Sequence, residues 1–191
     1  MISARDIETL FSKQLSRIKD TDLRQKVIDT WVLGCQEGNW QTVEELKAMP
    51  FTLLTDTKGV SFIEHSIAVT EGACALVEAQ LEAYRKMPYE ISMDRLIAGG
   101  LLHDVGKLLE VEKDSKGGYR MSLSGKCARH PSSGAILAAR VRLPWEIVNI
   151  IVCHAKEGEG RPQVIETVFI HQADFATFDP LVMGQKGQLI E

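Results

Sequence analysis

Hydrophobic residues recur at three- and four-residue steps along most of the chain, a spacing typical of amphipathic helices. A first run follows Ser3, a predicted N-cap, and a second begins near Thr21 and is expected to be broken by Gly34 and the Gly38–Asn39 pair. A third, short run covers residues 42–48. Residues 1–55 therefore predict a helical section. Because this section contains no histidine, we interpret it as a cover or an interface rather than a catalytic part.

The middle of the chain predicts two longer helices. Ser61 and Glu64 fit a capping box, in which the serine hydroxyl and the glutamate carboxylate satisfy backbone donors at a helix start. The next apolar run begins near Ser92 and is expected to stop with the help of Gly106. Residues 108–121 change character and predict a loop or a short β-hairpin.

Further helices are expected in the C-terminal part of the chain. One follows His130 and Pro131, with Ser132 or Ser133 as its cap, and the next has Pro144 in its first turn. The buried face of the last helix is expected to carry Ile165, Val168, Phe169 and Ala173. The pattern as a whole predicts an all-α fold.

Composition narrows the class of protein. Of the 191 residues, 45% are hydrophobic and 25% are charged, which is ordinary for a soluble globular protein. The formal net charge of −4 disfavours an extended nucleic-acid surface, although a cleft can still bind a small phosphorylated molecule. The four cysteines form no CxxC pair, and the chain has neither a signal-peptide pattern nor an apolar run of about 20 residues. These features predict a cytoplasmic protein without a membrane span.

Four of the five histidines form an ordered series with two aspartates, namely His65, His103, Asp104, His130, His154 and Asp174. Any one of these histidines alone could be a packing or capping residue. An adjacent His103–Asp104 pair after a buried apolar run is harder to explain in that way. We therefore interpret the series as a metal site that several helices assemble.

The donor set suggests how ions would be shared at this site. Asp104 can bridge two ions, because each carboxylate oxygen can bind one. A first ion would take His65, His103, Asp104 and Asp174, and a second would take Asp104, His130 and His154. Imidazole and carboxylate without thiolate favour iron, manganese, cobalt, nickel or zinc over calcium. The prediction is one or two divalent transition metal ions.

At this point the chain resembles a known family. His65, His103–Asp104 and Asp174 resemble the H…HD…D signature of the HD-domain superfamily of metal-dependent phosphohydrolases. Residues 101–107 look like its HD-x-GK element, and residues 171–174 resemble its closing "AD" helix. The intervening histidines His130 and His154 are similar to those of the subset with two-metal sites.

The resemblance covers roughly residues 60–180 and implies a helical bundle of about five core helices. We expect residues 1–55 to be an N-terminal helical extension, residues 56–182 the metal-binding domain and residues 183–191 a tail. The apolar N-terminal helices could also pack on a second copy, so a homodimer is left open.

The resemblance also implies a reaction, which is hydrolysis of a phosphate ester or anhydride of a small, nucleotide-like substrate by metal-activated water. Asp104 is the candidate for bridging the ions and orienting the water. Lys107 is the first candidate for contacting the phosphate, and Arg129, Lys156 and Arg161 are further ones. The alternative for each of the four cations is a solvated side chain.

The sequence is also compatible with other functions. A di-iron oxygenase of the HD fold uses a similar ligand set, and a non-catalytic regulatory module that binds a metal or a nucleotide is a third possibility. The chain is also similar to small bis(5′-nucleosyl)-tetraphosphatases. Residues 154–162 resemble the HHExxxGxGYP element of cyclic-di-GMP phosphodiesterases, but Ala155 and Arg161 depart from it. His171 lies three residues before Asp174, and we favour a packing or supporting role for it.

Overall fold

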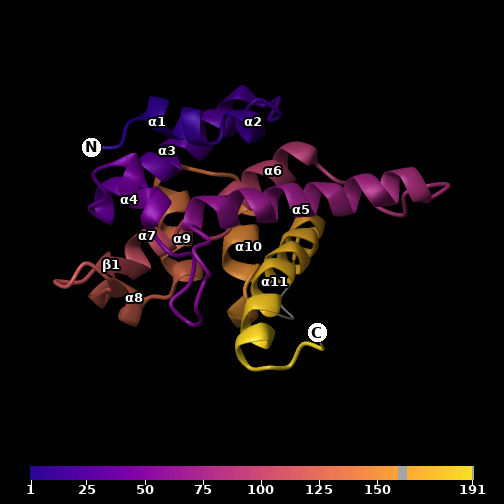
Figure 1. The fold of residues 1–191 in the computed structure, drawn as a ribbon. Helices are drawn as coiled ribbons and strands as arrows, with labels where there is room; N and C mark the ends of the chain where they lie inside the picture. Colours follow the sequence, from indigo (N-terminus) through magenta and orange to yellow (C-terminus); the bar gives the residue numbers. More distant parts are fainter. Residues whose placement is uncertain (159–162, 191) are drawn as a thin grey trace.

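Helices make up most of the computed structural model, which describes residues 1–158 and 163–190 (Figure 1). The α-helices are α1 (Ala4–Leu10), α2 (Ser12–Leu15), α3 (Thr21–Glu37), α4 (Val43–Ala48), α5 (Phe62–Ala83), α6 (Met93–Leu102), α7 (Lys107–Glu110), α8 (Leu123–Cys127), α9 (His130–Arg140), α10 (Trp145–Cys153) and α11 (Ile165–Gln185). Strands β1 (Val111–Lys113) and β2 (Tyr119–Met121) pair antiparallel, and a short 3-10 helix spans Lys156–Gly158. The predicted all-α fold and its small hairpin are confirmed.

Short-range signals account for the starts of several helices. The side chains of Ser3, Thr42 and Ser61 each accept a hydrogen bond from a backbone N–H three residues on, and each is part of a capping box. Asp20 caps α3 by accepting from two backbone N–H groups. The predicted starts of α1, α3, α4 and α5 are therefore confirmed.

The N-terminal helices are tied to the segment that carries the His–Asp pair. The buried indole of Trp31 donates to the carbonyl of Leu101 at 3.0 Å, and that of Trp40 donates to the carbonyl of Leu108 at 2.8 Å. Leu101 precedes and Leu108 follows the turn between α6 and α7. Carbonyls near the end of a helix have no hydrogen-bond partner within the helix. Two long-range bonds therefore fix the turn that presents the pair.

Two glycines have a different role from the predicted one. Helix α3 continues through Gly34 and ends at Glu37, directly before the predicted Gly38–Asn39 break, and a Cβ at Gly34 would lie 2.7 Å from a methyl carbon of Leu108. Gly106 has ordinary right-handed angles (φ −64°, ψ −16°), and a Cβ there would lie 2.1 Å from the carbonyl oxygen of His130. Gly106 needs its missing side chain because backbone atoms approach it, Gly34 packs closely against the Leu108 side chain, and neither glycine ends a helix.

Three finer predictions were wrong. Helix α9 begins at His130 with Pro131 in its first turn, and the Ser133 hydroxyl donates to the Gly106 carbonyl instead of capping the helix. The first predicted helix is interrupted at Phe11, which separates α1 from α2. Val168 is 43% exposed, so it does not belong to the buried face of α11.

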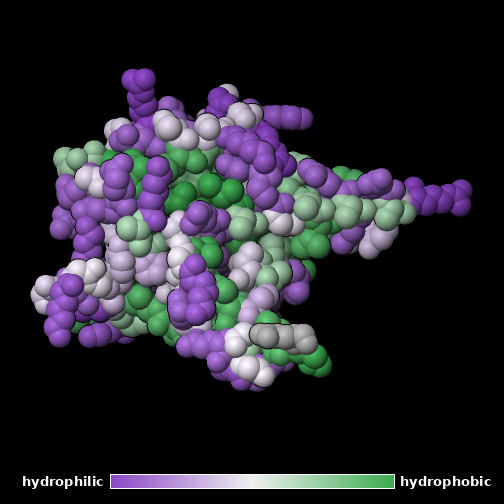
Figure 2. Space-filling model, in the orientation of Figure 1, coloured by the Kyte–Doolittle hydropathy of each residue, from purple (hydrophilic) through white to green (hydrophobic). Residues whose placement is uncertain are grey.

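The loop between α4 and α5 descends from the level of α4 toward the lower half of the molecule, while the far end of α5 projects beyond the other helices (Figure 1). The base of this loop is closed, because the backbone N–H of Phe62 donates to the carbonyl of Met49 and Pro50 forms a β-bridge with Ser61. On the face in Figure 2, hydrophobic residues reach the surface on both sides of the loop. No helix within the described residues is long and apolar enough to cross a membrane.

Candidate metal centre

Five parts of the fold bring the six predicted donor residues together. Helix α5 carries His65, the turn after α6 carries His103 and Asp104, α9 begins with His130, α10 is followed by His154, and α11 carries Asp174. They form two groups, His65–His103–Asp104–Asp174 and Asp104–His130–His154, with ligand atoms within 4.8 Å of one another in each group. Residues separated by more than 100 positions in sequence therefore meet at one point.

Asp104 lies at the centre, because its two oxygens face different groups. Its Oδ2 lies 3.2 Å from Nε2 of His65 and 3.4 Å from Nε2 of His103. Its Oδ1 lies 3.2 Å from Nε2 of His130 and 3.4 Å from Nε2 of His154. This is the arrangement expected of a carboxylate shared by two cations.

Backbone carbonyls fix the protonation of two histidine rings. Nδ1 of His103 lies 2.6 Å from the carbonyl oxygen of Gly100, and Nδ1 of His154 lies 2.9 Å from that of Ile151. A carbonyl oxygen can only accept, so Nδ1 carries the proton in both rings. In the neutral ring, Nε2 then has a free lone pair directed at Asp104, as a metal ligand requires.

In the other two rings, a side-chain oxygen instead of a backbone carbonyl lies against Nδ1. The Thr177 hydroxyl donates to the carbonyl of Asp174, so its oxygen is left to accept from Nδ1 of His65 at 3.2 Å. Nδ1 of His130 lies 3.2 Å from Oε2 of Glu110, which also accepts from the His130 backbone N–H. All four rings are therefore held with Nε2 turned inward.

Two buried atoms at the centre lack a hydrogen-bond partner among the described residues. They are Oδ1 of Asp104 and Nε2 of His154, and both belong to the second group. Lone pairs that face each other without a shared proton are costly when buried, and a cation between them removes that cost. The donor set therefore fits a divalent metal ion.

Both carboxylates of the centre are ionised near neutral pH. Burial alone would raise the pKa of Asp104, but the charge of Lys107 and the neighbouring His103 ring hold it well below its usual range. Burial likewise opposes ionisation of Asp174, and the His65 ring, whose Nε2 lies 3.2 Å from its carboxylate, lowers its pKa to about 2. Two negative charges are therefore available to attract a cation.

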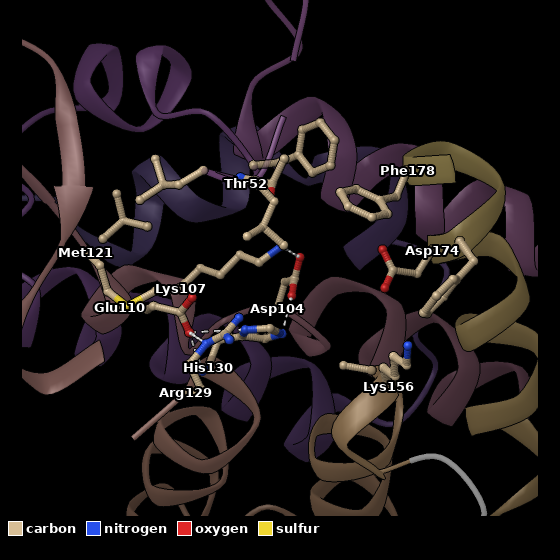
Figure 3. A pocket seen from close by; sticks show the side chains of 16 residues that line it. Thr52, Asp104, Lys107, Glu110, Met121, Arg129, His130, Lys156, Asp174 and Phe178 are labelled. Atoms are coloured by element: carbon tan, nitrogen blue, oxygen red, sulfur yellow. Dashed lines mark hydrogen bonds and ion pairs between the residues drawn. The ribbon is translucent and has the colours of Figure 1, made fainter. Parts of the chain in front are cut away.

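A cavity of about 470 Å³ opens onto the centre (Figure 3). It is lined by Phe51, Thr52, Leu53, Leu54, Asp104, Lys107, Glu110, Val111, Met121, Arg129, His130, Ala155, Lys156, Asp174, Phe175 and Phe178. Of the predicted phosphate-binding residues, Lys107, Arg129 and Lys156 line it, and the Lys107 ammonium pairs with Asp104. Arg161 lies outside the described residues. Three cations and three carboxylates therefore line one cavity, and Arg129 pairs with the carboxylate of Glu110.

His171 lies outside both groups of donors. Its Nδ1 is 2.6 Å from the carbonyl oxygen of His154, and its ring packs on Phe175 with centroids 4.5 Å apart. These contacts agree with the expected supporting role, because they hold the chain at the end of α10.

Sequence reasoning missed three residues that hold the histidines in place. Thr177 and Glu110 accept from the outer nitrogens of His65 and His130, and the Phe51 ring stacks on His65 with centroids 4.3 Å apart. A charged residue inside the apolar run Leu-Leu-Glu-Val was a usable signal for Glu110. Phe51 had no comparable signal, since it comes from the section interpreted as a cover.

The family model of the HD domain matches residues 62–176, which contain all six donors. The chain belongs to the HD domain family. Its match to "Dihydroneopterin 2′,3′-cyclic phosphate phosphodiesterase" of Methanocaldococcus jannaschii is 28% identical over 168 residues, covering 86% of the chain and 66% of that protein. This HD domain protein is also 32% identical over 116 residues to "Ribonuclease Y" of Pseudothermotoga lettingae.

The ribonuclease Y match covers 61% of the chain but only 18% of that relative. "Ribonuclease Y" of Thermotoga maritima is 30% identical over 116 residues, with the same coverage. The chain thus spans less than two thirds of the length of these curated relatives. No solved structure gives a significant match.

Proposed function

We propose that this HD domain protein is a metal-dependent phosphohydrolase that cleaves a phosphate ester of a small, nucleotide-like molecule. The observation that carries the proposal is the Asp104 carboxylate, which faces a histidine group on each side at the floor of a cavity lined with cations. The names of the relatives support it, since both describe the cleavage of phosphate esters.

In this proposal the six donors bind one or two divalent ions, and Asp104 is the shared ligand. When bound, such ions lower the pKa of a coordinated water toward neutrality and counter the charge of a phosphoryl oxygen. Iron, manganese, cobalt, nickel and zinc all suit imidazole and carboxylate ligands. The protein supplies the fixed rings, the ionised carboxylates and the enclosure.

The cations of the cavity are proposed to bind the phosphoryl group. Lys107 follows Asp104 by about one helical turn, and its ammonium forms an ion pair with the Asp104 carboxylate. An anionic substrate arriving there competes for the same ammonium. Arg129 and Lys156 line the cavity with Lys107, and Arg161 is proposed as a further phosphate contact.

A small substrate is favoured over an RNA chain. The formal net charge of −4 does not suit an extended polyanion, whose binding depends on many cationic contacts. A cavity of about 470 Å³ lies in the range of small-ligand sites. We therefore assign the ester to a nucleotide-like small molecule.

The test is a hydrolysis panel run on the full chain. Protein stripped with chelator and reloaded with Mn²⁺ or Fe²⁺ is incubated with nucleoside 2′,3′-cyclic phosphates, nucleoside monophosphates and dinucleoside polyphosphates. Cleavage of at least one class is expected, and Asp104→Ala is expected to lose it while keeping its helical circular dichroism. Bound metal without cleavage of any ester would contradict the proposal, and dioxygen uptake in its place would indicate an oxygenase.

A further inference from the structure

We propose that residues 51–54, together with Phe178, form a binding surface for a planar heterocyclic ring of the substrate. The protein then distinguishes phosphate esters by the base they carry as well as by the phosphate. This inference rests on the proposed function, because it assigns the part of the cavity that the metal centre and the cations leave unused.

The surface comes from outside the part of the chain that the HD family model matches. Residues 51–54 precede the matched residues 62–176 and belong to the loop between α4 and α5. The two ends of that loop are joined by the hydrogen bond from Phe62 to Met49. The loop is therefore held over the cavity by its own base, and it adds a wall that the matched region does not supply.

The side chains of this wall are mainly apolar, and its inner part is buried. Phe51 is buried and stacks on His65, and the Phe178 ring meets Phe51 edge-on with centroids 6.4 Å apart. Leu53 and Leu54 line the same cavity but are 39% and 72% exposed. An apolar group that covers two solvent-facing leucines removes their surface from water, and this burial favours binding.

The floor of the cavity beneath this wall is polar, since the Lys107 ammonium lies 5.7 Å from the centroid of the Phe51 ring, so a ligand would be oriented. Figure 3 shows Lys107 reaching to Asp104 beneath the segment with Thr52, while Phe178 stands above Asp174. A phosphate held by Lys107 would place the rest of the molecule against the loop and α11. A molecule with a phosphate at one end and a flat apolar ring at the other matches this division.

The size of the cavity supports the same occupant. About 470 Å³ is far more than a phosphate needs and suits a molecule of nucleotide size. Aromatic and leucine side chains bind planar bases by stacking and by excluding water, without needing a particular pattern of hydrogen bonds. The surface therefore selects a flat ring by its shape. Guanosine carries such a ring and serves as the probe in the test.

The test compares two ligands that share a ribose and a phosphonate, of which only one carries a base. Phosphonate analogues of guanosine 5′-monophosphate and ribose 5-phosphate, in which a C–P bond replaces the ester, are titrated into the Mn²⁺-loaded protein. The guanosine analogue is expected to bind more tightly than the ribose analogue. Leu54→Ser is expected to weaken the guanosine analogue by about tenfold and to leave the ribose analogue unchanged.

Leu81→Ser is the matched control, because Leu81 is 55% exposed on α5 and does not line the cavity. It is expected to leave both dissociation constants unchanged. Equal affinity for the two analogues in the wild-type protein, or an equal loss of both in Leu54→Ser, would overturn the inference. Because these ligands are not hydrolysed, base-dependent binding with no cleavage in the hydrolysis panel would overturn the proposed function alone.

Discussion

At the scale of single residues, the centre depends on side chains that hold other side chains. The His103 and His154 rings are oriented by carbonyls, whereas the outer nitrogen of His130 meets the carboxylate of Glu110. Burial alone would raise the pKa of Glu110, but the hydrogen bond from His130 lowers it to about 2. A carboxylate behind an imidazole fixes the ring and makes its inner nitrogen a better ligand.

Glu110→Gln is therefore expected to act on one of the two donor groups. Affinity should fall by about 10- to 100-fold for an ion at the group of Asp104, His130 and His154, and the other group should be little affected. A metal titration that resolves two binding steps measures this. The control is Glu112→Gln, whose carboxylate pairs with Arg120 on the hairpin. Equal weakening of both steps would show that Glu110 only supports the fold.

The six residues that meet at the candidate centre could be picked out from sequence, because histidine is rare in this chain and one His–Asp pair follows an apolar run. Their outer partners could not. Gly100 and Ile151 act through their backbone carbonyls. Every residue has a backbone carbonyl, so the residue type gives no sign of this role. Thr177 lies 112 positions from His65, and only the fold brings them together.

At the scale of secondary structure elements, the capped starts of α1, α3, α4 and α5 were predictable, whereas helix contacts were not. Capping boxes use residues three apart, so they are visible in sequence, as at Ser61. Gly106 was expected to help end a helix, but its angles are ordinary and its missing side chain makes room for the start of α9. The distinction depends on which helix packs there, and short-range patterns do not contain that information.

Gly106→Ala is expected to push α9 away from the turn that carries Asp104. Its Cβ would lie 2.1 Å from the His130 carbonyl oxygen and 2.5 Å from the backbone nitrogen of Gly134. Backbone atoms cannot yield as a flexible side chain does, so we expect the free energy of unfolding to fall by about 1–3 kcal/mol. Chemical denaturation measures this.

The control for that variant is Gly72→Ala within α5. A Cβ at Gly72 would lie 3.5 Å from Cβ of Ala173, an ordinary contact, and alanine is the better helix residue by about 0.5–1 kcal/mol. The control should therefore be neutral or slightly stabilising. A Gly106→Ala protein as stable as wild type would show that α9 does not need this close approach.

At the scale of the whole molecule, the N-terminal section and the HD region share one hydrophobic core. The buried cluster runs from Ile2 to Ala173, and Trp31 and Trp40 bond to carbonyls on either side of the His–Asp turn. The sequence predicted helices here and a covering role, but not that residues 51–54 would line the cavity. Such a contribution depends on long-range packing, which the periodicity of a single helix does not reveal.

The central claim is that six side chains from five parts of the fold, Asp104 at their centre, hold divalent ions. Calorimetric titration of chelator-stripped wild-type protein with Mn²⁺ tests this claim most directly. Saturable binding of one or two ions per chain is predicted, and Asp104→Ala should lose it while remaining folded. A wild-type protein that binds no ion at saturation, or an Asp104→Ala protein that binds as many ions as wild type, would contradict the account.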